Sequence, residues 1–156
     1  MAKIVRACRE HLSEIALIES LCFSDPWSEK ALELLLNESC VAFVALIDGR
    51  VAAYGGLMIV LDEGQVINIA THPDYRRQGL ARNIMNALSC SACELGLGAM
   101  FLEVREQNSP ARALYRSDGW AEVGVRKNFY SHPVDNAVIM QKRFERYLIF
   151  QCIFWV

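Results

Sequence analysis

A six-residue turn between an apolar strand and a long helical pattern constrains this chain more than any other segment. The run from Val66 to Ala70 is apolar apart from one asparagine, and the helical pattern extends from Gly79 to about Leu95. Between them, residues 76–81 read Arg-Arg-Gln-Gly-Leu-Ala. A glycine at such a turn lets the backbone approach a ligand closely, and the N–H groups of a first helical turn bind anions. The turn therefore predicts a site for a phosphate or pyrophosphate group.

The spacing of this turn argues against two common nucleotide-binding motifs. It is a poor match both to the Walker motif Gly-x-x-x-x-Gly-Lys-Ser/Thr and to the Rossmann motif Gly-x-Gly-x-x-Gly. It resembles instead the Arg/Gln-x-x-Gly-x-Gly/Ala signature of the Gcn5-related N-acetyltransferases (the GNAT superfamily), with Arg76, Gly79 and Ala81 at the three defined positions. This resemblance implies that the pyrophosphate of acetyl-coenzyme A binds at the turn. A helix start with solvent-exposed arginines is the alternative.

The remaining periodicity predicts seven strands and four helices. Strands are expected at 3–8, 41–47, 51–60, 65–71, 100–104, 121–127 and 137–143, and helices at 12–22, 29–36, 79–95 and 110–118. The order β-α-α-β-β-β-α-β-α-β-β predicts an α/β fold with a mixed, mostly antiparallel central sheet flanked by helices on both faces. It is also the element order of the GNAT fold.

Several expected boundaries depend on single local signals. Asp48-Gly49 predicts a tight hairpin, and Asp62-Glu63-Gly64 predicts the turn before the next strand. Ser28 is the expected N-cap of the second helix, and Ser109 is the expected N-cap of the last helix, with proline at its first position. Gly119 is expected to end that last helix.

Length and charge limit the classes of protein to which the chain could belong. With 156 residues we expect one acetyltransferase domain over residues 1–146, followed by an apolar tail over residues 147–156. The net charge of −2 gives no reason to expect nucleic acid or an anionic membrane as a partner. The chain has neither a secretory signal at its N-terminus nor an apolar run near the roughly 20 residues that span a bilayer, so we expect a cytoplasmic protein.

The six cysteines give no sign of a disulfide framework or a metal site. In a cytoplasmic protein they are expected to be reduced thiols. One Cys-x-x-Cys pair, at Cys90 and Cys93, stands late in a helical pattern and far from the histidines of the chain. Zinc binding needs a second pair of ligands, so no metal is expected.

Two residues could carry the chemistry of amide formation from a thioester, which needs a base for the amine and an acid for the thiolate. Glu103 stands in the apolar run 100–104, where partial desolvation would raise its pKa toward the range of a general base. The alternative is an ion pair with Arg105 or with a neighbour at the strand end. Tyr115, a phenol with an ordinary pKa of about 10, could donate a proton to the thiolate. The alternative for Tyr115 is packing in the core or on the surface.

A longer series of segments resembles the RimI-type protein N-terminal alanine acetyltransferases. In chain order, the segments are Pro26-Trp27-Ser28-Glu29-Lys30, Asn68-Ile69-Ala70, Asp74-Tyr75-Arg76-Arg77-Gln78-Gly79-Leu80, Leu102-Glu103-Val104-Arg105, Asn108, Ala113-Leu114-Tyr115 and Gly119-Trp120. The resemblance covers roughly residues 3–143.

This resemblance implies a role for each matching residue. Glu103 would accept the proton of the attacking amine, and Tyr115 would protonate the leaving thiolate. Asn108 would contact coenzyme A, and the loop that contains Trp27 would border the acceptor groove. The backbone that holds the pantetheine and the thioester carbonyl would be that of Ile69, Ala70 and Thr71. The pyrophosphate loop would consist of Arg77, Gln78, Gly79, Leu80, Ala81 and Arg82.

The acceptor implied by the resemblance is a protein N-terminal peptide, specifically the alanine of a small-subunit ribosomal protein. The pKa values of the two kinds of protein amine favour such an acceptor. A free α-amine has a pKa of about 7.7–8.0 and a lysine about 10.4, so deprotonating lysine at neutral pH costs roughly 3.5 kcal/mol more. Acetylation of a lysine or of a small-molecule amine on the same fold remains an alternative, as does a non-catalytic acetyl-coenzyme A binder.

Three features depart from the family pattern. Phe129 stands where the first of two tyrosines is usual, and Asn136 replaces an acid before the last strand. Both changes lie on the acceptor side, so they leave the exact substrate open. The apolar tail, residues 147–156, extends past the usual end of the family. It could add a strand to the sheet, contact a partner subunit in a homo-oligomer or occupy a neighbour's groove.

Overall fold

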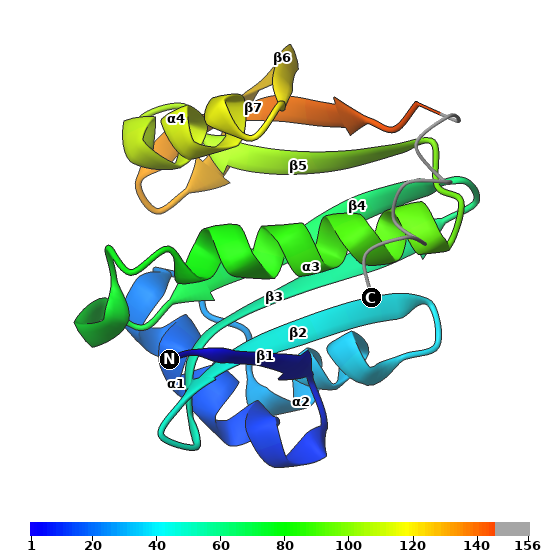
Figure 1. Cartoon of the computed structure of the whole chain (residues 1–156). Coiled ribbons are helices and arrows are strands. Elements are labelled where there is room, and N and C mark those ends of the chain that lie inside the picture. Colours follow the sequence, from blue (N-terminus) through cyan, green and yellow to red (C-terminus); the bar gives the residue numbers. More distant parts are fainter. Residues whose placement is uncertain (146–156) are drawn as a thin grey trace.

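A seven-stranded sheet runs through the part of the chain, residues 1–145, that the computed structural model describes (Figure 1). The strand order is β1-β2-β3-β4-β5-β7-β6, and every pair among these strands is antiparallel except β4 with β5. The strands are β1 (Lys3–Arg6), β2 (Cys40–Ile47), β3 (Arg50–Val60), β4 (Glu63–Thr71), β5 (Ala99–Arg105), β6 (Ala121–Ser131) and β7 (Val134–Arg143). The predicted mixed, mostly antiparallel sheet is therefore confirmed.

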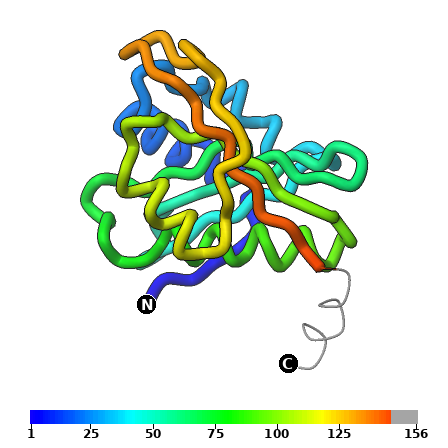
Figure 2. Tube along the Cα trace, turned by 90° about the horizontal axis from the view of Figure 1, so that it is seen from above, coloured from blue at the N-terminus to red at the C-terminus, as the bar shows by residue number. Residues whose placement is uncertain are grey.

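Helices cover both faces of the sheet, as the sequence predicted. They are α1 (Leu12–Cys22), α2 (Glu29–Leu32), α3 (Leu80–Glu94) and α4 (Ser109–Ser117), together with the short 3-10 helices η1 (Arg9–His11), η2 (Glu33–Leu36) and η3 (Pro73–Tyr75). Viewed along the sheet, α1 and α2 lie on one side and α3 lies on the other (Figure 2). The two faces bury separate apolar clusters, one around α1 and one around α3.

The contact between α3 and the sheet follows from the 3.6-residue period of its apolar side chains. Ile84 and Leu88 have no exposed surface and belong to one face of the helix. A Cβ atom on Gly55 of β3 would stand only 2.5 Å from Cγ2 of Ile84. The glycine therefore allows α3 to pack closely on the centre of the sheet.

Two of the predicted boundaries are confirmed by their geometry. Asp48 and Gly49 both have positive φ, 49° and 78°, which is the conformation of a tight hairpin turn. The hydroxyl of Ser28 accepts a hydrogen bond from the Ala31 N–H at 3.1 Å and so caps α2. The α-helix ends at Leu32, however, and the chain continues as the 3-10 helix η2 to Leu36.

Four other predicted boundaries are wrong. The turn before β4 consists of Leu61, with φ 57°, and Asp62, because Glu63 and Gly64 already belong to β4 and Gly64 pairs with both neighbouring strands. The N-cap of α4 is Asn108, not Ser109, because the Asn108 side-chain oxygen accepts from the Ala111 N–H at 3.2 Å. The last two strands are longer than expected, since β6 and β7 pair beyond the apolar core up to Ser131 and Val134.

In residues 1–145, no helix combines the length and apolar character needed to cross a membrane. The tail of residues 147–156, and with it the expected domain boundary at residue 146, lies outside the described residues.

Candidate active site

The parallel strands β4 and β5 pair for three residues and then separate. Residues 63–65 of β4 pair with residues 99–101 of β5. Beyond that point β4 remains paired with β3 as far as Thr71, and β5 remains paired with β7 as far as Arg105. In the described part of the chain, the facing edges of β4 and β5 therefore carry backbone groups without a strand partner. Such groups can hydrogen-bond an extended ligand.

A β-bulge bends β4 where this separation begins. Gly55 pairs with Ile69 and Leu57 pairs with Val66, so two residues of β4, Ile67 and Asn68, lie opposite the single residue Gly56. A bulge leaves an extra residue unpaired and bends the strand at that point. The segment Ile69, Ala70 and Thr71, which the sequence assigned to the pantetheine and the thioester, comes directly after the bulge.

The predicted pyrophosphate loop has the geometry of an anion site. Gly79 adopts φ 75° and ψ 10° as the N-cap of α3, and no side chain caps this end of the helix. The first hydrogen bond of the helix runs from the Asn83 N–H to the Gly79 carbonyl at 3.0 Å. Within the described residues, the N–H groups of Leu80, Ala81 and Arg82 are therefore left for a ligand. A Cβ atom on Gly79 would meet no protein atom within 4 Å, so the space beside the glycine is open.

The arginine side chains of this loop contact different residues. Arg82 donates from Nε to Asp118 at 3.1 Å and from Nη2 to Ser117 at 3.0 Å, which connects the start of α3 to the end of α4. Arg76 reaches Sγ of Cys22 at 3.6 Å. Arg77 and Gln78 are exposed to solvent. Arg82 can thus contribute its backbone N–H to an anion while its side chain holds α4 in place.

Glu103 lies on the separated part of β5 with 24% of its side chain exposed. Its carboxylate forms an ion pair with Arg126 of β6, with 3.1 Å between Oε1 and Nη1. The ion pair that the sequence left open therefore exists, but its partner is not Arg105. Arg105 instead donates to the carbonyls of Pro133 and His132 at the β6–β7 turn. The partner could not be found from sequence spacing, because it depends on the register of β6 across β7.

Tyr115 lies in α4 with 6% of its surface exposed and packs against the ring of Trp120. Burial, with a smaller contribution from Tyr130, raises the pKa of Tyr115 to about 12. Its hydroxyl makes no hydrogen bond within residues 1–145, where no buried side-chain oxygen or nitrogen lacks a partner. The hydroxyl is therefore not completely buried, and its raised pKa keeps it protonated at neutral pH.

Tyr130 of β6 interacts electrostatically with both Glu103 and Tyr115. The sequence did not assign it a role in the site. Burial raises the pKa of Tyr130, and the negative charge of Glu103 raises it further. The guanidinium of Arg105 lies 4.2 Å from the centre of the Tyr130 ring. Tyr130 thus affects Tyr115 and is itself affected by Glu103, although the three residues come from β6, α4 and β5.

Phe129 and Asn136, the two residues that depart from the family pattern, both have defined contacts. The Asn136 side chain donates to Glu106 at 2.8 Å and accepts from the Asn128 N–H at 2.9 Å. An acid at position 136 would face the Glu106 carboxylate, so the amide removes a repulsion between like charges. Phe129 has 44% of its surface exposed and forms an edge-to-face contact with Tyr130, with 5.0 Å between the ring centres.

The helices that carry the predicted residues begin at one end of the parallel pair. Because β4 and β5 run in the same direction, α3 and α4 both follow the carboxyl ends of these strands. The loop before α3, the open edge of β4 and Glu103 therefore lie around the place where the two strands separate. Asn108 lies there as well, at the start of α4, but its side-chain oxygen is used for the helix cap. The contacts of Arg82 with Ser117 and Asp118 bring the end of α4, which carries Tyr115, to the start of α3.

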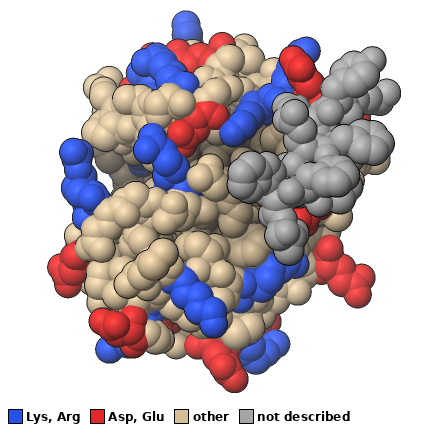
Figure 3. Space-filling view, viewed as in Figure 1, with Lys and Arg blue, Asp and Glu red and all other residues tan. Residues whose placement is uncertain are grey.

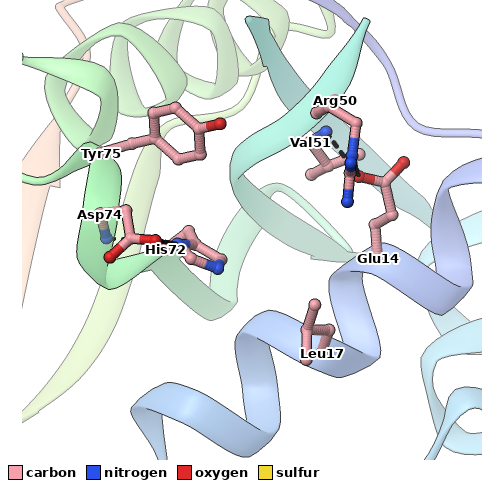
Figure 4. Close-up of a pocket in the computed structure, with 7 residues that line it drawn as sticks. All are labelled: Glu14, Leu17, Arg50, Val51, His72, Asp74 and Tyr75. Atoms are coloured by element: carbon pink, nitrogen blue, oxygen red, sulfur yellow. Dashed lines mark hydrogen bonds and ion pairs between the residues drawn. The ribbon is translucent and has the colours of Figure 1, made fainter.

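A cavity of about 180 Å³ lies elsewhere, beside α1 (Figure 4). It is lined by Glu14, Leu17, Arg50, Val51, His72, Asp74 and Tyr75. Glu14 is already occupied, because it accepts from the Val51 N–H at 3.0 Å and pairs with Arg50. No residue of β5 or α4 lines this cavity, so it is separate from the site around Glu103.

Charged side chains do not gather by sign on the face of the molecule that carries α3. Lysine and arginine are interspersed there with aspartate and glutamate (Figure 3). The surface charge of this face therefore does not by itself mark a site for an anion.

Comparisons with known proteins give consistent results for the family and the fold. Residues 12–120 match the sequence model of the Acetyltransferase (GNAT) family. The chain is 38% identical to the ribosomal protein bS18-alanine N-acetyltransferase of Escherichia coli over 125 residues, 79% of this chain and 84% of that protein. It is 35% identical to a putative ribosomal protein bS18-alanine N-acetyltransferase of Bacillus subtilis over 133 residues, 84% of this chain and 88% of that protein. The crystal structure of the enzyme from Escherichia coli superposes with a TM-score of 0.86 and 34% identity, covering 92% of this chain and 94% of the other.

Proposed function

The chain belongs to the acetyltransferase (GNAT) family, and we propose that it transfers the acetyl group of acetyl-coenzyme A to the α-amine of a protein N-terminus. The observation that carries this proposal is the separation of β4 from β5, with an anion site at the start of α3 and with Glu103 and Tyr115 beside it. The relatives described above are named for the alanine of ribosomal protein bS18. We propose an N-terminal alanine of the same kind as the acceptor.

The proposed reaction is a direct transfer within a complex of enzyme, donor and acceptor. Glu103 accepts a proton from the ammonium group, directly or through a water, and the amine nitrogen then attacks the thioester carbonyl. A bond forms between this nitrogen and the acetyl carbon, and the carbon–sulfur bond breaks. Tyr115 gives its proton to the departing thiolate. A backbone N–H on the edge of β4 between Ile69 and Thr71 would polarise the carbonyl.

The donor would lie along the open edge of β4 with its pyrophosphate on the loop of residues 77–82. Two features support this placement: the three N–H groups at the start of α3 and the open space beside Gly79. Asn108 would contribute its side-chain NH₂ group, since its oxygen caps α4.

Release of coenzyme A thiol from acetyl-coenzyme A tests the proposed activity. The acceptors are short peptides that begin with Ala, Ser or Met, and an N-acetylated Ala peptide that contains an internal lysine. We expect turnover with a free N-terminal Ala or Ser and none with the blocked peptide. Turnover of the blocked peptide would show that the enzyme acts on lysine. Tight binding of acetyl-coenzyme A without turnover of any peptide would favour a small-molecule acceptor or a non-catalytic binder.

Gly79→Ala is expected to raise the KM for acetyl-coenzyme A about tenfold, which corresponds to about 1.4 kcal/mol of binding free energy. The added Cβ would occupy the open space where the pyrophosphate is proposed to lie, and the positive φ would become strained. Gly49→Ala is the matched control, because Gly49 has φ 78° and equally open surroundings but lies in the β2–β3 turn. Both variants should lose similar thermal stability. An equal change of KM in the two variants would contradict the proposed loop.

A further inference from the structure

Glu19 of α1 is a fully buried carboxylate that the proposed reaction does not use. Its exposed fraction is 0%, and among residues 1–145 no lysine, arginine or histidine forms an ion pair with it. It is held by hydrogen bonds alone, from the Tyr54 hydroxyl, from Nδ2 of Asn68 at 2.9 Å and from the Trp27 N–H at 2.8 Å. Burying a carboxylate without a cation is costly, and an apolar side chain would serve stability better. The carboxylate therefore points to a purpose beyond stability.

Two of the three hydrogen-bond partners of Glu19 belong to segments that border the proposed site. Asn68 is part of the bulge in β4, directly before the edge that is proposed to hold the thioester. Trp27 lies near the end of the loop of residues 23–28 that connects α1 to α2. The two carboxylate oxygens of Glu19 thus connect this loop to β4, the strand that is proposed to hold acetyl-coenzyme A.

The other end of the same loop touches the β6–β7 turn. The Ser24 hydroxyl donates to the His132 carbonyl, and Asp25 lies 3.2 Å from Nδ1 of His132. The His132 carbonyl also accepts from Arg105, which is two residues from Glu103 on β5. Figure 2 shows the β6–β7 turn beside the α1–α2 region, far from it in sequence. The loop 23–28 therefore extends from the bulge of β4 to the side of the site that carries the proposed base.

We propose that Glu19 is a positioning residue that holds the loop 23–28 against the bulge of β4 and so sets where the acceptor peptide lies relative to the thioester. This inference rests on the proposed function and deepens it, because it assigns the placement of the acceptor to a residue that touches neither substrate. The essential contact is with the Trp27 N–H. A backbone N–H can only donate, whereas the Tyr54 hydroxyl and the Asn68 amide can each turn and accept.

Two single substitutions distinguish the effect of the charge of Glu19 from the effect of its side-chain length. In Glu19→Gln the carbonyl oxygen still accepts from Trp27, and the NH₂ group donates to Tyr54 and to a turned Asn68 amide. Glu19→Asp keeps the charge but is one methylene shorter, so it cannot reach Trp27 and Asn68 together. We expect the peptide KM of Glu19→Gln to stay within about threefold of wild type and that of Glu19→Asp to rise about tenfold. The KM for acetyl-coenzyme A should change little in either variant.

Tyr54→Phe is the control for general loosening of the core. It removes one hydrogen bond to Glu19 but leaves the contact with Trp27, so it should lower the thermal midpoint without raising the peptide KM. Amide hydrogen exchange at Trp27 adds a readout independent of turnover, and it should be faster in Glu19→Asp than in Glu19→Gln. An unchanged peptide KM in Glu19→Asp, or an equal rise in Tyr54→Phe, would overturn the inference. A wild-type protein that acetylates no peptide would instead refute the proposed function, and the exchange at Trp27 would still decide whether Glu19 holds the loop.

Discussion

Glu103→Gln is expected to lower kcat/KM for the acceptor peptide by about 100- to 10,000-fold, the usual contribution of a general base. The amide has the same size as the carboxylate, but it cannot take a proton from the amine. Because Glu103 is only partly buried and its partner Arg126 is exposed, the fold should tolerate the change. Binding of acetyl-coenzyme A, measured by calorimetry, should persist, since no part of the proposed pyrophosphate loop is altered.

A control for this substitution is available on β6. Glu122 is also an acid in an ion pair, at 2.8 Å from Arg112, and 32% of its side chain is exposed. Glu122→Gln removes the same charge from a position outside the proposed site and should leave kcat/KM near the wild-type value. The assignment of Glu103 as the base would be wrong if the two variants lost activity equally, or if Glu103→Gln kept full activity.

Tyr115→Phe is expected to lower kcat by about 100-fold or more, because the thiolate would have to leave without a proton donor. The substitution should cost little stability, since the hydroxyl makes no hydrogen bond within residues 1–145 and the ring keeps its contact with Trp120. A large decrease in kcat together with a small change in thermal midpoint would distinguish a catalytic role of Tyr115 from a structural one. Tyr75→Phe, at the separate cavity beside α1, is the control and should keep its activity.

The pH profile gives a second test of the same assignment. Burial raises the pKa of Tyr115 to about 12, so the phenol keeps its proton throughout the range in which the enzyme would be assayed. The wild-type rate should rise as the acceptor amine loses its proton, near pH 8 for an α-amine with a pKa of about 7.7–8.0. It should not fall again near pH 10, where an ordinary tyrosine titrates. A decline centred near pH 10 that disappears in Tyr115→Phe would contradict the raised pKa.

Much of the fold was predictable because its signals are local. Ile84 and Leu88 repeat with the period of a helix, and the positive φ angles at Asp48 and Gly49 follow from the conformational freedom of these residue types. The order of elements then left few arrangements other than a mostly antiparallel sheet covered on both faces. The predictions that failed concern ends of elements, such as the cap at Asn108, where two neighbouring polar residues compete for the same N–H group.

The candidate site was predictable only in part. Gly79, Glu103 and Tyr115 stood out because their residue types and their places in the pattern suit an anion, a base and an acid. The contribution of Tyr130 and the ion pair with Arg126 could not be found in this way, because both depend on how β6 is registered across β7. Glu19 was hidden for a similar reason, since an acid in an amphipathic helix is usually exposed, whereas this one is buried beneath Tyr54 and Asn68.

The sequence by itself determined the elements, their order and the strand-to-helix turn at Gly79, because backbone preference and side-chain periodicity act over a few residues. Only the tertiary structure decided where β4 leaves β5, which cation faces Glu103 and which donors surround Glu19. These features arise from contacts between segments far apart in the chain. Their geometry depends on strand register and burial, which no short stretch of sequence specifies.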